Sequence, residues 1–550
     1  MKKFSKNNFS TVTTTTDNEG AAVKKPIIFK RKAFLLKLLL VANFAVLFAY
    51  PSSGQGNQAK MAADNTIEVN VLSKERNQVI EHFGASDAWS TQFVGLWPDQ
   101  KKNAIAELLF SKEEDEDGSP KGIGLSMWRF NVGAGSTEQG QESGIRDEWR
   151  RAESFLTADG SYDWSKQAGQ VWFAKAAKEF GLEKLLVFPN SPPVYMTKTG
   201  KAYAKDGKSN LAEKNFNDYG EYLAQVIKGL GEKGLKVDYV SPVNEPQWDW
   251  SDGGQEGTPF SNLEIAGIVK ALDQALSRNM LSTKIDVAEA GKINYLFENA
   301  DKEERGEQIA NFFNPGSANY IGDLAHLSRT ISAHSYFTTS PYIAAVQQRQ
   351  NLNAALGKVE GLSYWMSEYC ILGGNEGEIK GNGRDLGIDP ALYIARVIHN
   401  DLTVSNASAW HWWIAISPYN YKDGLIYIDK QKTDGEFYES KMLWALGNYS
   451  RFIRPGYQRL AVEINNEKQQ GPDFLASAYE SIDQRELVLV FVNSSDQELK
   501  VNLAEDGNSI SIKALFLTSK DKDLESVART DSDGAVTIPA RSIMTVLTEN

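Results

Sequence analysis

Two glutamates in this chain stand where buried strands are expected to end. Glu245 follows the apolar run over residues 237–243, and Glu368 follows a similar run over residues 362–367. Side chains that follow parallel strands gather at one edge of a sheet, where ligands bind. Two carboxylic acids that meet there can cleave a glycosidic bond, because one protonates the leaving oxygen and the other attacks the anomeric carbon.

The two acids need different pKa values to fill these different roles. Glu245 has Trp248 and Trp250 close by in the sequence, an apolar setting that favours a protonated acid and suits the faces of a sugar ring. Glu368 must stay ionised to attack, and Arg129, at the end of an earlier apolar run, is a candidate cation for that purpose. We therefore expect Glu245 to be the acid and Glu368 the nucleophile.

Short apolar runs alternate with helical patterns between residues 78 and 450, which predicts an α/β catalytic domain. Eight such runs favour an eight-fold β/α (TIM) barrel with long loops, and an open doubly wound sheet is the alternative. Helices are expected over residues 172–180, 219–233, 261–278, 341–356 and 390–400. The expected barrel strands are residues 79–85, 124–132, 184–189, 237–243, 284–288, 330–335, 362–367 and 408–414.

The pattern changes after Tyr449. The chain becomes rich in β-forming residues with Asn, Asp and Gly clusters between the runs, which predicts an all-β sandwich over residues 451–550. The alternating segment over residues 66–73 is expected to join it. This side domain either binds carbohydrate or supports the barrel, and its direct continuity with the barrel favours support. Its expected strands are residues 474–479, 486–492, 509–517 and 535–538.

Residues 1–60 have the order of a secretory signal. A basic flank at residues 30–32 precedes an apolar run over residues 33–49 and a small, polar exit over residues 51–56. The long amino-terminal flank and the interruption by Lys37 leave an uncleaved membrane anchor as the alternative. We expect a secreted or periplasmic protein that contacts no membrane beyond this segment.

Composition excludes several classes of protein. A formal net charge of -12 argues against a nucleic-acid partner, because phosphate binding needs clustered Lys and Arg. The single cysteine, Cys370, forms no disulfide framework and is expected to be a small buried filler. The Gly-rich segment 133–140 lacks the spacing of a dinucleotide loop, and the acidic segment 113–118 lacks a calcium loop's final glutamate. The five histidines show no zinc pattern, so neither a metal nor a cofactor is expected.

Motifs along most of the chain resemble a known enzyme family. Val-Asn-Glu-Pro at residues 243–246, followed by Trp-Met-Ser-Glu at residues 365–368, resembles the retaining barrel glycosidases whose Asn-Glu pair closes the fourth strand. The family most similar is glycoside hydrolase family 30, in particular its branch of endo-β-1,6-galactanases. The segments that carry this resemblance are residues 83–89, 125–135, 149–155 and 190–196.

The resemblance implies roles for individual residues. Glu245 is the implied acid/base and Glu368 the implied nucleophile of a double displacement with retention, with their carboxyl groups about 5 to 5.5 Å apart. Asn244 is expected to bind the 2-hydroxyl of the substrate, and Tyr336 to orient the nucleophile. An eighth-strand tryptophan is expected under the sugar, either Trp413 or, if the register differs, Trp410. The remaining residues expected to line the glycone pocket are Asp87, Trp89, Asn131, Asn190 and His334.

The expected partner is a polysaccharide or oligosaccharide. The resemblance favours β-1,6-galactan, with xylan and β-1,6-glucan as alternatives within the same class of enzyme. A rival hypothesis from another class is a non-catalytic glycan-binding protein on the same scaffold, and the presence of both glutamates argues against it. Endo or exo action and the oligomeric state stay open at this point.

Overall fold

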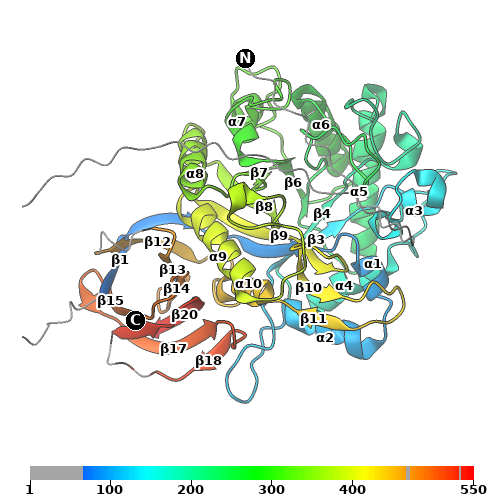
Figure 1. The fold of residues 1–550 in the computed structure, drawn as a ribbon. Coiled ribbons are helices and arrows are strands. Elements are labelled where there is room, and N and C mark those ends of the chain that lie inside the picture. Colours follow the sequence, from blue (N-terminus) through cyan, green and yellow to red (C-terminus); the bar gives the residue numbers. More distant parts are fainter. Residues whose placement is uncertain (1–65, 466–470, 530, 532–533, 550) are drawn as a thin grey trace, which may run out of the picture. The chain divides into compact units, whose positions relative to one another are not determined.

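The computed structural model of this protein describes residues 66–465, 471–529, 531 and 534–549 (Figure 1). The predicted secretory signal or anchor over residues 1–60 lies outside the described residues. Among the described helices, none combines the length and the apolar character that a bilayer span requires.

A closed barrel of eight parallel strands forms the first part of the fold. Each strand pairs with the next along the chain, and β9 closes the ring by pairing with both β8 and β2. This closure confirms the predicted barrel and makes the open doubly wound sheet wrong. The barrel strands are β2 (His82–Ser86), β3 (Met127–Asn131), β4 (Lys184–Phe188), β5 (Tyr239–Val240), β6 (Lys284–Ala290), β7 (Leu327–His334), β8 (Ser363–Tyr369) and β9 (Ala407–Ser417). Two further strands, β10 (Gly424–Ile428) and β11 (Phe437–Glu439), extend the sheet beyond β9.

Helices connect the strands and pack around the barrel (Figure 1). A capping box between Ser261 and Glu264 starts α6 (Asn262–Arg278). Gly220 lets α5 (Phe216–Glu232) approach α6 closely, since a β-carbon at this position would lie 2.9 Å from the backbone of Ala271. The helices are α1 (Thr91–Val94), α2 (Asp99–Phe110), α3 (Ser136–Gln139), α4 (Ala168–Glu179), α5 (Phe216–Glu232), α6 (Asn262–Arg278), α7 (Gln308–Phe313), α8 (Tyr342–Leu356), α9 (Ile388–Thr403) and α10 (Lys441–Ser450). Short 3₁₀ turns cover Gly140–Ser143, Glu148–Arg150, Val194–Met196, Glu213–Asn215, Ile293–Leu296 and Asn375–Gly377.

Ten strands hydrogen-bond into one continuous sheet that forms the side domain. Both faces of its strand β14 are covered. Val488, Val490 and Val492 pack into the core shared with the barrel helices, while the alternate positions, such as Leu489 and Phe491, pack into the side domain's own core. The strands are β1 (Ile67–Val79), β12 (Gln458–Ile464), β13 (Phe474–Glu480), β14 (Leu487–Asn493), β15 (Leu499–Glu505), β16 (Asn508–Ser509), β17 (Ser511–Thr518), β18 (Glu525–Val527), β19 (Ala535–Ile538) and β20 (Ser542–Glu549).

The first described strand belongs to the side domain. Strand β1 lies between β12 and β15, antiparallel to the first and parallel to the second, with Val71 opposite Val462. It continues to Val79, which the sequence analysis placed in the first barrel strand. Strand β1 therefore leads from the side domain directly into the barrel.

Polar groups also join α10 to the side domain. The Asn448 amide donates to Thr518 Oγ1 at 2.6 Å, and Thr545 Oγ1 donates to the amide oxygen of the same residue at 3.0 Å. Phe452 and Phe516 pack with tilted rings, whose centroids are 4.4 Å apart. The side sheet is thus packed on the barrel helices, as a supporting domain would be.

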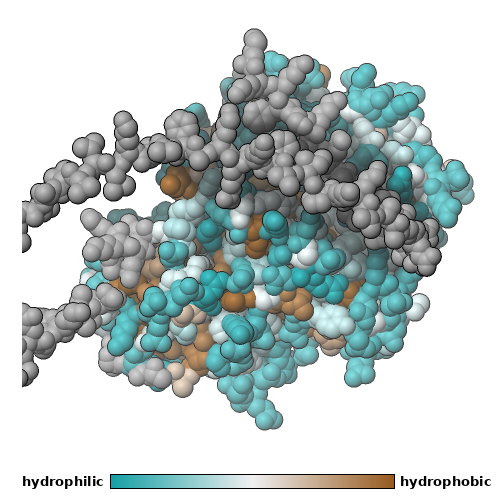
Figure 2. All heavy atoms as spheres, viewed as in Figure 1, coloured by the Kyte–Doolittle hydropathy of each residue, from teal (hydrophilic) through white to brown (hydrophobic). Residues whose placement is uncertain are grey.

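The part of the surface that is visible and coloured in Figure 2 is mainly hydrophilic. On the face shown in Figure 2, apolar side chains lie scattered among polar ones. Cys370 is buried and free, which agrees with the filler role expected for it.

The position of β1 leads to a stability prediction. Val71 is fully buried in the side domain's core, whereas Val79 of the same strand is 47% exposed. Val71→Asp should lower the free energy of unfolding by about 3 kcal/mol or more, because it buries an unpaired carboxylate. Val79→Asp is the matched control and should change it by less than about 0.5 kcal/mol. Thermal and urea unfolding measure both, and equal effects would contradict the packing of β1.

Candidate active site

Nearly all of the predicted site residues stand at the carboxyl ends of the barrel strands. Each of the eight strands contributes at least one side chain to this rim, either from its last residues or from the turn that follows. These residues are Asp87 and Trp89 after β2, Arg129 and Asn131 on β3, Asn190 after β4, Asn244 and Glu245 after β5, Glu289 on β6, His334 and Tyr336 at the end of β7, Glu368 on β8 and Trp413 on β9.

The two predicted catalytic glutamates face each other. A carboxylate oxygen of Glu245 and one of Glu368 lie within 4.8 Å, with a ring nitrogen of His334 in the same group. Glu245 is 7% exposed and Glu368 is 2% exposed. The backbone of Glu245 has a φ of 43°, a left-handed conformation that is uncommon for a residue with a side chain and is often found at functional sites.

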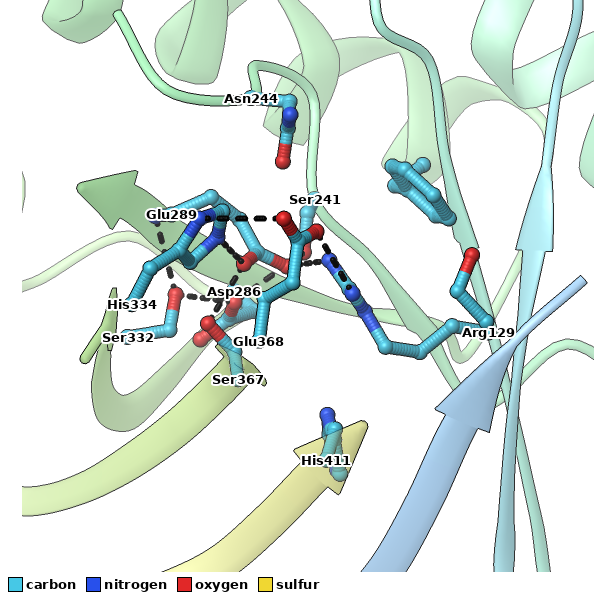
Figure 3. A network of polar contacts seen from close by, with 12 residues as sticks. Arg129, Ser241, Asn244, Asp286, Glu289, Ser332, His334, Ser367, Glu368 and His411 are labelled. Carbon is cyan, nitrogen blue, oxygen red and sulfur yellow. Dashed lines mark hydrogen bonds and ion pairs between the residues drawn. The ribbon is translucent and has the colours of Figure 1, made fainter. Parts of the chain in front are cut away.

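His334 lies among three carboxylates, and Figure 3 shows two of them, those of Glu289 and Glu368. Its Nδ1 is 3.0 Å from Glu245 and 3.4 Å from Glu368, and its Nε2 is 3.0 Å from Glu289. Burial disfavours the imidazolium, but the three carboxylates outweigh it and raise the pKa of His334 to about 10. His334 is therefore a charged donor at neutral pH. It was expected to line the sugar pocket, but its two ring nitrogens already bind carboxylates.

Glu368 is held from two sides. Arg129 Nη1 donates to Oε2 at 3.0 Å, and the Tyr336 hydroxyl donates to Oε1 at 3.0 Å. These contacts match the predicted cation and the predicted orienting group. Burial nevertheless raises the pKa of Glu368, although His334 and Arg129 oppose this shift. Arg129 is fully buried, so it acts on carboxylates and lies too deep to form the pocket surface.

A second buried acid pair, Asp286 and Glu289 on β6, was not among the predicted site residues (Figure 3). Glu289 accepts from Arg129 at 3.1 Å, and burial alone would raise its pKa, but Arg129 and His334 lower it. Asp286 lies beside it, where burial raises its pKa, and Ser332 donates to it at 2.6 Å. The barrel strand expected from the sequence ended at residue 288, one residue before Glu289, whereas β6 continues to Ala290. The signal that could have found this pair is the presence of two acidic residues in an otherwise apolar strand, because buried acids need partners and often mark a site.

Two amides leave polar atoms free at the rim. The Asn244 Nδ2 group donates to Asn190 Oδ1 at 3.1 Å. Asn244 Oδ1 and Asn190 Nδ2 are buried without a protein partner. A buried polar atom normally has a hydrogen-bond partner, so a hydroxyl-rich ligand would satisfy both of these groups.

An aromatic wall forms another side of the site. Trp413 packs edge-to-face on Trp89 with centroids 5.4 Å apart, and its ring centroid is 6.5 Å from that of Phe188. Asp87, two residues before Trp89, accepts from the backbone of Asn131 at 2.7 Å, and burial raises the pKa of its carboxyl well above the usual range. Apolar faces beside convergent polar groups are typical of a small-molecule or sugar pocket.

Trp410, the alternative to Trp413, does not reach this wall. It is fully buried on the helix side of β9, and its indole donates to Asp401 at 3.0 Å. Arg349 and Ser335 also donate to Asp401, at 2.7 and 3.1 Å. Successive residues of a strand face opposite sides of the sheet, and Trp410 and Trp413 are three positions apart on β9, so Trp413 faces the site while Trp410 faces the helices.

Among the described residues, the group of Glu245, His334 and Glu368 has the spacing of metal ligands. A metal needs a neutral imidazole, so it would have to displace the proton that the surrounding carboxylates favour on His334.

The charged imidazole predicts a pH-dependent stability. The pKa of His334 rises from an ordinary 6.5 to about 10 on folding, so its contribution is complete below pH 6.5 and is lost as the pH rises towards 10. Glu289→Gln removes one carboxylate partner and should make this loss smaller. Thermal unfolding midpoints from pH 6 to 10 measure it, with the exposed Glu376→Gln as a control. Parallel curves for the wild type and Glu289→Gln would contradict the assignment.

Comparison with known proteins places this geometry in a family. A solved structure of a conserved exported protein from Bacteroides fragilis is 33% identical, with a TM-score of 0.80 over 87% of this chain and 99% of that chain. Glucuronoxylanase XynC from Bacillus subtilis is 23% identical over 90% of this chain and 93% of its own length. An exo-β-1,6-galactobiohydrolase from Bifidobacterium longum is 28% identical over 143 residues, which are 24% of this chain and 9% of that protein.

The family comparison covers most of the barrel. Residues 64–427 match the family described as O-Glycosyl hydrolase family 30, from β1 to the end of the barrel strands. The rim described above supplies the two carboxylic acids that glycosidic bond cleavage requires. This chain belongs to glycoside hydrolase family 30 and is a glycosidase.

Proposed function

We propose that this protein is a retaining glycoside hydrolase that cleaves β-1,6-galactan or a closely related β-linked polysaccharide. The observation that carries the proposal is the separation of at most 4.8 Å between carboxylate oxygens of Glu245 and Glu368. Retaining glycosidases hold their two carboxyl groups about 5 to 5.5 Å apart, whereas inverting ones need about 6.5 to 9.5 Å to admit a water molecule.

The first step forms a covalent intermediate. Glu368 attacks the anomeric carbon while Glu245 gives its proton to the glycosidic oxygen, so the leaving sugar departs as an alcohol. Arg129 and Tyr336, each 3.0 Å from Glu368, orient the attacking carboxylate. In the second step Glu245 takes a proton from water, the water attacks the same carbon and Glu368 is released.

His334 serves both steps in this mechanism. It lies 3.0 Å from Glu245 and 3.4 Å from Glu368, so a single positive charge faces both catalytic acids. Negative charge leaves Glu368 when the covalent bond forms, and it develops on Glu245 when the proton departs. A shared cation stabilises the charge on either carboxylate.

The choice of β-1,6-galactan rests on the sequence motifs and on the partial similarity to a galactobiohydrolase. The longer similarity to a glucuronoxylanase supports xylan, and β-1,6-glucan is the third candidate. Specificity is set by loops outside the shared rim, so the family alone does not select among them. The similarity to an exported protein supports secretion, which would bring the enzyme to an extracellular polysaccharide.

Glu368→Gln distinguishes an enzyme from a glycan-binding protein. The amide cannot attack the anomeric carbon, so kcat should fall by about 10³-fold or more while oligosaccharide binding persists. Glu376→Gln, a change of an exposed glutamate with the same chemistry, should leave the rate unaltered. A Glu368→Gln protein that hydrolyses at the wild-type rate would disprove the mechanism.

Product analysis tests the stereochemistry and the substrate together. Proton NMR during hydrolysis of defined β-1,6-galactans, xylans and β-1,6-glucans should show the β-anomer first, because two displacements restore the configuration. The galacto-oligosaccharides should have the highest kcat/KM. An α-anomer as the first product would overturn retention, and a preference for xylan or glucan would replace galactan as the substrate.

A further inference from the structure

Phe337 has an unexpected setting next to the catalytic rim. It follows Tyr336, which donates a hydrogen bond to Glu368, yet the Phe337 side chain is 49% exposed. Its backbone has a φ of 58°, a left-handed conformation that is an outlier for a bulky residue. Both the exposed ring and this backbone are unfavourable for folding, so stability does not explain them.

The Phe337 ring lies between the two loops that follow the catalytic glutamates. On one side it meets Trp248 edge-to-face, with centroids 6.2 Å apart and planes at 89°. Trp248 belongs to the turn after Glu245, to whose carbonyl its amide donates at 3.2 Å. On the other side it faces Gly373, where a β-carbon would come within 3.2 Å of the ring. Gly373 follows β8, the strand of Glu368.

This position assigns the ring to the leaving-group side. The acid Glu245 must face the oxygen that leaves, and Trp248 is in the turn that follows it. The other aromatic wall, with Trp413 and Trp89, comes from β9 and from the turn after β2, away from the loops that hold Phe337 in the sequence. Lys292 places its ammonium group 5.2 Å from the Trp248 ring centroid and adds a hydrogen-bond donor on this side.

We propose that Phe337 and Trp248 form a binding subsite for the first sugar of the leaving group, which stacks its apolar face on the exposed phenyl ring. This inference rests on the proposed glycosidase function and deepens it. The substrate is then a glycan that continues past the cleaved bond as a neutral pyranose. Binding energy from this sugar is used in the transition state, because it positions the leaving oxygen against Glu245.

The test compares two leaving groups on one glycone. Galactosyl fluoride, whose leaving group is too small to reach the ring, is compared with β-1,6-linked galactotriose. Phe337→Ala should lower the ratio of kcat/KM for galactotriose to that for the fluoride by about tenfold, and Phe337→Trp should restore it. Ile482→Ala removes another exposed apolar side chain, in the side domain, and should leave the ratio as in the wild type. An unaltered ratio for Phe337→Ala would overturn the subsite.

Further readouts separate this proposal from other outcomes. Phe337→Gly relieves the left-handed backbone, so its unfolding midpoint should be no lower than that of the wild type, and a large fall would show that the ring is structural. If the wild type prefers xylan or β-1,6-glucan, galactan fails as the substrate, and the same ratio is measured with the matching trisaccharide and fluoride. A wild type that neither hydrolyses nor binds any of these saccharides would overturn both the function and the subsite.

Discussion

The active site depends on one electrostatic balance in a buried space. Glu245, Glu289 and Glu368 are each at most 7% exposed, and burying such carboxylates without partners would cost several kcal/mol per group. Arg129 and the protonated His334 supply the compensating charge, and each of them contacts more than one carboxylate. The five groups come from five different strands or strand ends, so they meet only when the barrel is closed. Closure of the ring and assembly of the catalytic charges are therefore the same event.

Much of this could be predicted from the sequence, since the main signals are local. Apolar runs located all eight barrel strands, and the residues after the runs located Glu245 and Glu368. The role of Glu289 was not predictable, because its partners His334 and Arg129 lie on other strands whose register the sequence does not contain. The choice between two tryptophans on β9 was open for a similar reason, because it depends on which face of the strand the barrel turns inward. Short-range periodicity locates an element, whereas neighbouring strands decide which way each side chain points.

The barrel and the side domain are joined by a common hydrophobic core as well as by the connecting chain. The valines of β14 that face the barrel helices and the leucines that face the other way leave this strand no exposed surface. Its continuous apolar run, which has no polar alternate positions, follows from burial on both faces. The side domain therefore acts as an outer layer of the barrel's own core, which agrees with a supporting role.

The place of β1 has a consequence for synthesis. In β1, Leu72 pairs with Ala461, so the strand leaves the ribosome long before either of its neighbours exists. It must wait as an unpaired edge while the whole barrel is made, and contacts between such distant parts of a chain form slowly. We expect the nascent protein to need protection from aggregation during this interval, and β1 with its partners β12 and β15 to be the last strands to acquire resistance to proteases.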